Sequence, residues 1–64
     1  SGDESVLFSP GDRVRIVGIV STPELNGLVG TILKYDNNIN RWILKMEESG
    51  KGKGIKSENL ELIE

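Results

Sequence analysis

The feature that most restricts the fold of this chain is a series of short segments in which apolar and polar residues alternate. Each segment ends at turn residues. The period of two is typical of β-strands with one buried face, and no stretch shows the 3.6-residue period of an amphipathic helix. The expected strands cover residues 13–17, 30–35, 41–46, 53–56 and 60–63. Turn sequences lie between them, including Pro10-Gly11-Asp12 before the first strand and Asn26-Gly27 before the second. The sequence therefore predicts an all-β domain of five short strands.

The small size of the chain favours a sheet that closes on itself. Sixty-four residues allow one domain, and closure into a small barrel would remove the unpaired edges of an open sheet. One 3₁₀ turn is expected at "SENL" before the last strand, with Ser57 as its cap. We assign residues 10–64 to the barrel domain. We interpret residues 1–9 as a linker or cloning remnant and lead-in of a domain taken from a larger protein.

Two absent residue types exclude several kinds of chemistry. The chain has no cysteine and no histidine. It therefore lacks disulfides, thiolate and imidazole metal ligands, and the Ser-His-Asp and Cys-His catalytic arrangements. The adjacent carboxylates Glu47 and Glu48 fall in an expected exposed turn with nothing to desolvate them. We predict that the chain is not an enzyme and uses no cofactor and no metal.

Composition also predicts where the chain acts. The lack of cysteine is typical of a reducing compartment, so an intracellular location in the cytoplasm or nucleus is expected. The longest apolar run, Ile16–Val20, is too short to cross a bilayer, so no membrane association is expected. We expect the isolated domain to be monomeric.

The charges are unevenly distributed along the chain. The formal net charge is −2, whereas residues 34–56 carry a net charge of +3. A basic middle between acidic ends indicates an anionic partner. The candidate anion-binding residues are Lys34, Lys45, Lys51, Lys53 and Lys56.

The stretch from Leu25 to Trp42 combines glycines with two aromatic residues. Asn26-Gly27 is typical of a turn, and Gly30 would allow a bend or a close approach of two strands. A phosphate-binding loop would need a helix after the glycines, and none is expected. We interpret these glycines as structural.

The pairing of the two strands around residues 36–40 has two registers. In the first, Tyr35 lies opposite Trp42 and Leu33 opposite Leu44. In the second, Ile32 meets Leu44 in the core, and Leu33 becomes part of an outward patch. A shift of one residue exchanges the faces of a strand, and both registers remain open.

Five short motifs are spread over the chain: Pro10-Gly11-Asp12-x-Val14, Leu25-Asn26-Gly27-x-x-Gly30-x-Ile32, Tyr35-Asp36, Arg41-Trp42-x-Leu44 and Glu58-Asn59-Leu60. Together they resemble SH3-like β-barrels, especially Tudor-like and KOW-like modules. The chain is also similar to the small barrel subunits of photosystem I and of ferredoxin–thioredoxin reductase. The resemblance implies a five-stranded barrel that binds methylated tails, RNA, proline-rich peptides or other subunits.

The predicted function is that of a non-catalytic interaction module in a larger protein. Its site is expected at the Tyr35–Trp42 hairpin and the adjoining Thr22–Leu25 loop, where a protein segment or a neighbouring subunit would bind. The candidate binding residues are Tyr35, Asp36, Arg41, Trp42 and Leu25. Trp42 is interpreted either as a core residue or as a rim aromatic that stacks on a ligand.

Two other functions are weighed. A KOW-like module would bind RNA with the central lysines on phosphates and Trp42 as a stacking platform. A Tudor-like module would enclose methyl-lysine in an aromatic cage. The three aromatic residues, Phe8, Tyr35 and Trp42, would make an incomplete cage.

Overall fold

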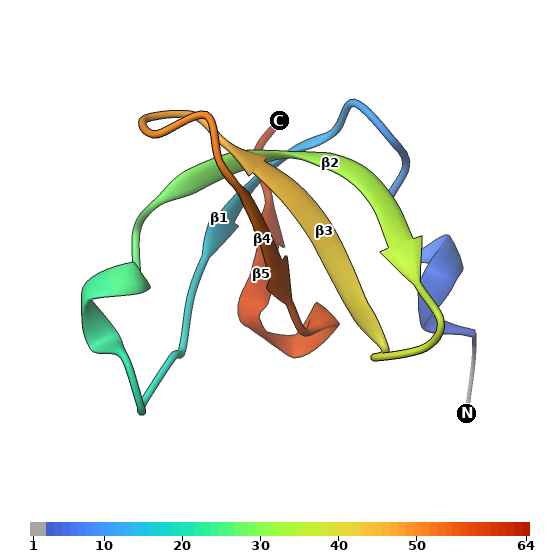
Figure 1. Cartoon of the computed structure of the whole chain (residues 1–64), viewed down its shortest axis with the longest axis horizontal. Helices are drawn as coiled ribbons and strands as arrows, with labels where there is room; N and C mark the ends of the chain where they lie inside the picture. Colours follow the sequence, from blue (N-terminus) through green and yellow to red (C-terminus); the bar gives the residue numbers. More distant parts are fainter. Residues whose placement is uncertain (1–2) are drawn as a thin grey trace.

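The computed structural model describes residues 3–64, which form one antiparallel sheet of five strands (Figure 1). The strands are β1 (Arg13–Ile16), β2 (Val29–Asp36), β3 (Arg41–Met46), β4 (Gly52–Ile55) and β5 (Leu60–Leu62). Their order across the sheet is β4-β3-β2-β1-β5. The predicted all-β domain of five short strands is confirmed, and each strand end lies within one residue of its expected position.

Three 3₁₀ helices occur among the described residues instead of the one that we expected. They are η1 (Glu4–Val6), η2 (Pro23–Leu25) and η3 (Ser57–Asn59). The carboxylate of Asp3 caps η1 by accepting hydrogen bonds from the backbone N–H and the hydroxyl of Ser5, at 2.9 and 2.7 Å. These two bonds, the backbone one first, lower the pKa of Asp3. None of the described helices is long and apolar enough to cross a membrane.

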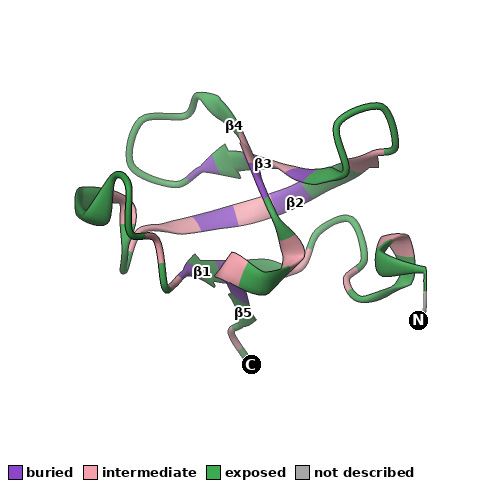
Figure 2. Cartoon of the chain, turned by 90° about the horizontal axis from the view of Figure 1, so that it is seen from below, coloured by how far each residue is buried: buried purple, intermediate pink, exposed green. Residues whose placement is uncertain are grey.

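The sheet does not close into the barrel that we expected. β4 and β5 stand at the two ends of the strand order and are not hydrogen-bonded neighbours, and Figure 2 shows them on opposite sides of the molecule. The reason lies in the connection between them, where Lys56 leads directly into η3. A 3₁₀ turn is not extended, so the chain crosses the open side of the sheet there without pairing the two short edge strands.

The core lies on one face of the bent sheet, and Figure 2 colours its buried residues purple. Alternate residues of β1 and β3 are buried, as the period-two pattern predicts. The buried hydrophobic residues are Val14, Ile16, Ile32, Trp42, Leu44, Met46, Ile55 and Leu60. No described residue with a polar or charged side chain is buried, so the core is stabilised by apolar packing.

A β-bulge in β2 combines the two registers left open by the sequence. Tyr35 pairs with Trp42 near the hairpin, whereas Ile32 pairs with Leu44 farther along, and the register shifts between Ile32 and Lys34. The extra residue at the bulge is Leu33, whose side chain is 48% exposed. One inserted residue places both Ile32 and Tyr35 of β2 on the side of Trp42 and Leu44, which neither uniform register would allow.

Ser57 does not cap η3 as we predicted. The N-cap position is Lys56, with no side-chain hydrogen bond to the helix. The hydroxyl of Ser57 instead accepts a hydrogen bond from the indole Nε1–H of Trp42 at 3.0 Å. Trp42 is only 1% exposed, so this bond satisfies its single polar atom and ties β3 to η3.

We predict that Ser57→Ala lowers the free energy of unfolding by about 1–2 kcal/mol, because it leaves the indole N–H without a partner. Chemical denaturation measures the loss, with the exposed Ser21→Ala as control. In a Trp42→Phe background, which lacks the donor, Ser57→Ala should cost much less. Equal losses in both backgrounds would show that the bond does not contribute.

Candidate functional site

The predicted hairpin residues form its turn and one strand edge. One carboxylate oxygen of Asp36 accepts a hydrogen bond from the backbone N–H of Asn38 at 2.9 Å, so this side chain stabilises its own turn. Arg41 begins β3 and extends over β4, where its guanidinium lies 3.4 Å from the carbonyl oxygen of Gly54. Asp36 thus has a local structural role, whereas Arg41 is exposed and directed toward η3 and β4.

The three aromatic rings pack against one another. Trp42 packs against both Phe8 and Tyr35, whose ring centroids lie 5.4 and 4.9 Å from its own in edge-to-face geometry. Such pairs stabilise a core. In this arrangement the rings enclose no open space of the kind that a methyl-lysine cage needs, and the buried Trp42 offers no face on which a base could stack.

Tyr35 lies beside η1. A small acidic hollow is lined by Asp3, Glu4, Tyr35 and two asparagines of the turn, Asn37 and Asn40. Desolvation, followed by the negative charges of Glu4 and Asp3, raises the pKa of Tyr35 above 10.0. The hairpin therefore contacts the N-terminal segment.

The structure does not bring the Thr22–Leu25 loop to the hairpin. Figure 1 shows η2 and the β2–β3 turn at opposite ends of the sheet. The reason is the length of β2, which runs from Val29 to Asp36 and separates the two segments. Leu25 packs against the core at its own end. The expected site that combined this loop with the hairpin is therefore not assembled.

A groove forms where β4 enters η3, opposite the loop that follows β1. Its volume is about 400 Å³. The lining residues are Gly18, Ile19, Val20, Ser21, Arg41, Ile55, Lys56, Glu58 and Asn59. Two predicted site residues, Arg41 and Lys56, line it, so they share one surface although Arg41 begins β3 and Lys56 is the N-cap position of η3.

Two asparagine side chains hold the loop that forms one wall of this groove. The amide of Asn26 makes a paired contact with Ile19, accepting from its backbone N–H at 2.8 Å and donating to its carbonyl at 2.9 Å. The amide of Asn59 donates to the carbonyl of Val17 at 2.9 Å. Gly18 lies between the two contacts with a φ of +68°, a conformation that favours glycine. The loop is thereby fixed without belonging to a strand.

Our sequence reasoning missed the roles of these asparagines. Asn26 and Asn59 stand in the motifs Leu25-Asn26-Gly27 and Glu58-Asn59-Leu60, which we interpreted only as turn sequences. An amide carries both a donor and an acceptor and can pair with backbone like a short strand. The paired donor and acceptor of each asparagine amide were the signal in the sequence that could have indicated these roles. The spacing of the residues does not show which loop the amides would bind.

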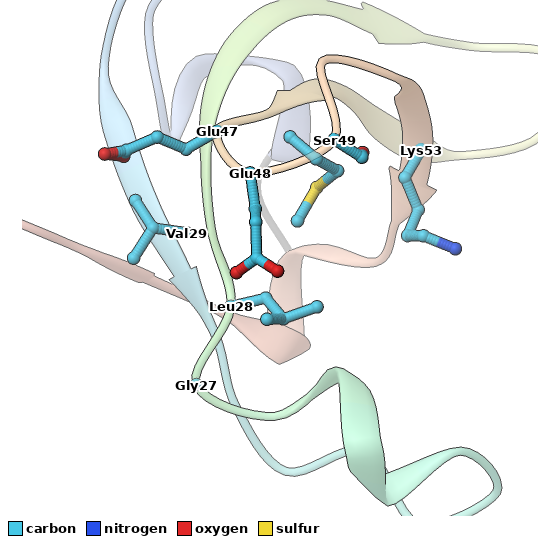
Figure 3. Close-up of a pocket in the computed structure, with 8 residues that line it drawn as sticks. Gly27, Leu28, Val29, Glu47, Glu48, Ser49 and Lys53 are labelled. Carbon is cyan, nitrogen blue, oxygen red and sulfur yellow. The ribbon is translucent and has the colours of Figure 1, made fainter.

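A larger cleft of about 500 Å³ lies between the start of β2 and the turn that joins β3 to β4 (Figure 3). Leu28 and Met46 contribute apolar walls, and Glu48 and Lys53 stand at its rim. Figure 3 shows the Glu48 carboxylate directed toward Leu28 and the Lys53 ammonium pointing elsewhere. Of the predicted site residues, this cleft contains only Lys53.

The candidate lysines do not share one face. Lys45 pairs with Gly52 and Leu44 pairs with Lys53. Because successive side chains of a strand point to opposite faces, Lys45 lies on the outer face and Lys53 on the core side at the edge. Lys34 pairs with Ile43, two residues before Lys45, and so belongs to the outer face. A nucleic acid that contacted all of these lysines through its phosphates would therefore have to reach both sides of the sheet.

The basic residues of β1 already have acidic partners. Arg13 forms an ion pair with Glu47 at 2.8 Å, and Arg15 forms one with Glu61 at 3.5 Å. All four side chains are largely exposed, so these pairs contribute little stability. Within residues 3–64, no three acidic side chains gather closely enough to hold a metal ion.

Comparisons with protein-family profiles, with curated proteins and with solved structures gave no match. The groove is therefore interpreted from its own geometry and chemistry.

We predict that Asn26→Asp loosens the groove wall. The substitution replaces the Nδ2 donor by an oxygen that faces the carbonyl of Ile19, which should cost about 1 kcal/mol. Hydrogen exchange should show faster exchange of the Ile19 amide. Asn38→Asp, with the same charge change in the hairpin turn, is the control, and equal protection of Ile19 in both variants would contradict the role of Asn26.

We predict that the phenol of Tyr35 titrates above pH 10, because the fold favours its neutral form. The corresponding stability is fully present below the unfolded-state pKa and is lost as the pH rises from there through the raised pKa of the folded state. Ultraviolet absorbance follows this single tyrosine. Glu4→Gln should lower the midpoint, whereas the distant Glu64→Gln should not. Equal midpoints in both variants would rule out the influence of η1.

Proposed function

We propose that this chain is a non-catalytic interaction module that binds an extended segment of a partner protein in the groove between residues 18–21 and η3. The observation that carries the proposal is that the loop forming one wall of this groove is held in place by side-chain hydrogen bonds. Two asparagine amides hold the loop in place, and its Val20 side chain remains 90% exposed. A fixed loop that presents an apolar side chain is suited to binding because little ordering entropy remains to be lost.

The groove combines two kinds of contact. Ile19 and Val20 supply apolar surface beside the buried Ile55, while Arg41 and Lys56 supply positive charge. Apolar contact would provide most of the affinity, and the charged groups would set the orientation of the segment. The preferred ligand is an extended segment with an apolar residue and, beside it, a carboxylate.

We further propose that the architecture is SH3-like. Five short strands and a 3₁₀ helix immediately before β5 support this interpretation. The unpaired edges of β4 and β5 distinguish the chain from a fully closed barrel. In this proposal, the aromatic hairpin stabilises the fold through Trp42, and Arg41 is the member of the predicted binding set that contacts the ligand.

A selection of peptides on the complete chain tests the proposal. A selected peptide should shift the amide resonances of Gly18–Ser21 and Asn59 in a saturable titration. Val20→Ser and Arg41→Gln should each weaken binding by about tenfold while changing the free energy of unfolding by less than about 0.5 kcal/mol. Val6→Ser is the matched control, because Val6 is also an exposed valine, 76% accessible, but lies in η1.

Two outcomes would contradict this function. Shifts confined to the Gly27–Val29 and Met46–Ser49 segments would assign binding to the larger cleft. Saturable binding of oligouridine at the groove, with no selected peptide bound there, would favour the RNA-binding alternative.

A further inference from the structure

The edge of β4 is open. β4 pairs with β3 alone among the described strands, and it ends the strand order of the sheet. An unpaired edge presents a row of backbone donors and acceptors to which another chain can pair.

The outward-facing groups of this edge can be assigned from the register. The backbone N–H of Met46 donates to the carbonyl of Lys51 at 2.8 Å. In an antiparallel pair, hydrogen-bonded and non-hydrogen-bonded positions alternate. Lys53 and Ile55, opposite Leu44 and Trp42, therefore bond to β3. Gly52 and Gly54 direct their N–H and C=O groups away from it.

The glycines at these two positions are not required by the fold of the chain itself. Gly30 is closely packed, because a Cβ there would lie 3.1 Å from the carbonyl oxygen of Lys45. Gly11, Gly18, Gly27 and Gly50 have positive φ angles. At Gly52 and Gly54 the φ angle is not positive, and a Cβ would find nothing closer than 3.8 and 3.5 Å.

Glycine in a strand interior costs about 0.5–1 kcal/mol relative to alanine. Two unneeded glycines, both at outward-facing positions of one edge, indicate a place that another backbone approaches closely. The Arg41 guanidinium, 3.4 Å from the Gly54 carbonyl, is consistent with the outward direction of that group.

The charge around this edge selects the partner. Lys51, Lys53 and Lys56 surround β4, and residues 50–57 contain no carboxylate. Within the described chain, none of these lysines forms an ion pair. Lys51 and Lys53 are two residues apart and so project to the same side of the strand. A second copy of β4 paired antiparallel would place like charges opposite one another, which is unfavourable.

We propose that the β4 edge receives an extended acidic segment of a partner protein, which adds to the sheet as a sixth strand. Its backbone pairs with Gly52 and Gly54, and its carboxylates lie opposite Lys51 and Lys53. This mode uses main-chain hydrogen bonds for affinity and side chains for selection. The inference does not depend on the groove, whose wall is formed by residues 18–21.

The test uses the complete ¹⁵N-labelled chain and the probe acetyl-Thr-Val-Glu-Val-Glu-Val-Thr-amide. Saturable binding should slow the hydrogen exchange of the Gly52 and Gly54 amides by about tenfold or more. A peptide with lysine in place of each glutamate should bind at least about tenfold more weakly. A peptide N-methylated along its backbone should not protect these amides, because it cannot form the ladder.

A matched pair of variants separates backbone pairing from nearby charge. Gly52→Pro removes an outward N–H that β3 does not use, so the native ladder is retained and binding should weaken about tenfold. Gly52→Ala keeps the N–H and adds only a methyl group, so it should weaken binding less than Gly52→Pro does. The N-methylated peptide gives the same information if the proline variant fails to fold.

Several results would overturn the inference. One is binding that shifts resonances without protecting Gly52 and Gly54, and another is equal binding of the glutamate and lysine peptides. A third is concentration-dependent dimerisation that protects the same amides without peptide, which would identify a second copy as the occupant. Protection of these amides by oligouridine would assign the edge to RNA. None of these results would bear on peptide binding in the groove, which Val20→Ser reports.

Discussion

The buried indole of Trp42 is the group on which the rest of the structure depends. Its ring contacts Phe8 from the N-terminal lead-in and Tyr35 from β2, and its N–H bonds to Ser57 at the start of η3. One side chain thus connects the N-terminal lead-in, β2 and the connection between β4 and β5. In a domain of this size, where little apolar surface can be buried, such a shared contact has a large weight. The position of η3, and with it one wall of the groove, follows from this packing.

The groove and the core are stabilised by different interactions. The core is apolar, and its residues come from alternate positions of the strands. The groove loop is held by the exposed amide of Asn26 and the partly buried amide of Asn59. Hydrogen bonds of this kind contribute about 1 kcal/mol each. The loop can therefore change its mobility or its sequence at Val20 without loss of the core, which allows binding to vary while the fold is kept.

β4 contributes to two surfaces with different chemistry. Its C-terminal residue, Ile55, enters the groove beside Arg41, where side chains provide the contacts. Its outer edge, at Gly52 and Gly54, offers main-chain groups. Both surfaces exist because the chain turns through η3 and does not pair β4 with β5. The open sheet is therefore the feature from which the two proposed modes of binding arise, and lysines near the edge limit pairing with a second copy.

The sequence by itself determined the strands, because period-two alternation and turn residues are local signals, and it excluded histidine and cysteine chemistry outright. It also indicated that Gly30 allows two strands to approach closely. Only the tertiary structure decided the register, since the bulge at Leu33 turns Ile32 and Tyr35 to the same side of the sheet, and alternation along the strand alone cannot predict that. The same holds for the open edges, for the separation of Leu25 from the hairpin, and for the split of Lys45 from Lys53. Each depends on which strands become neighbours, and that is set by packing over the whole chain.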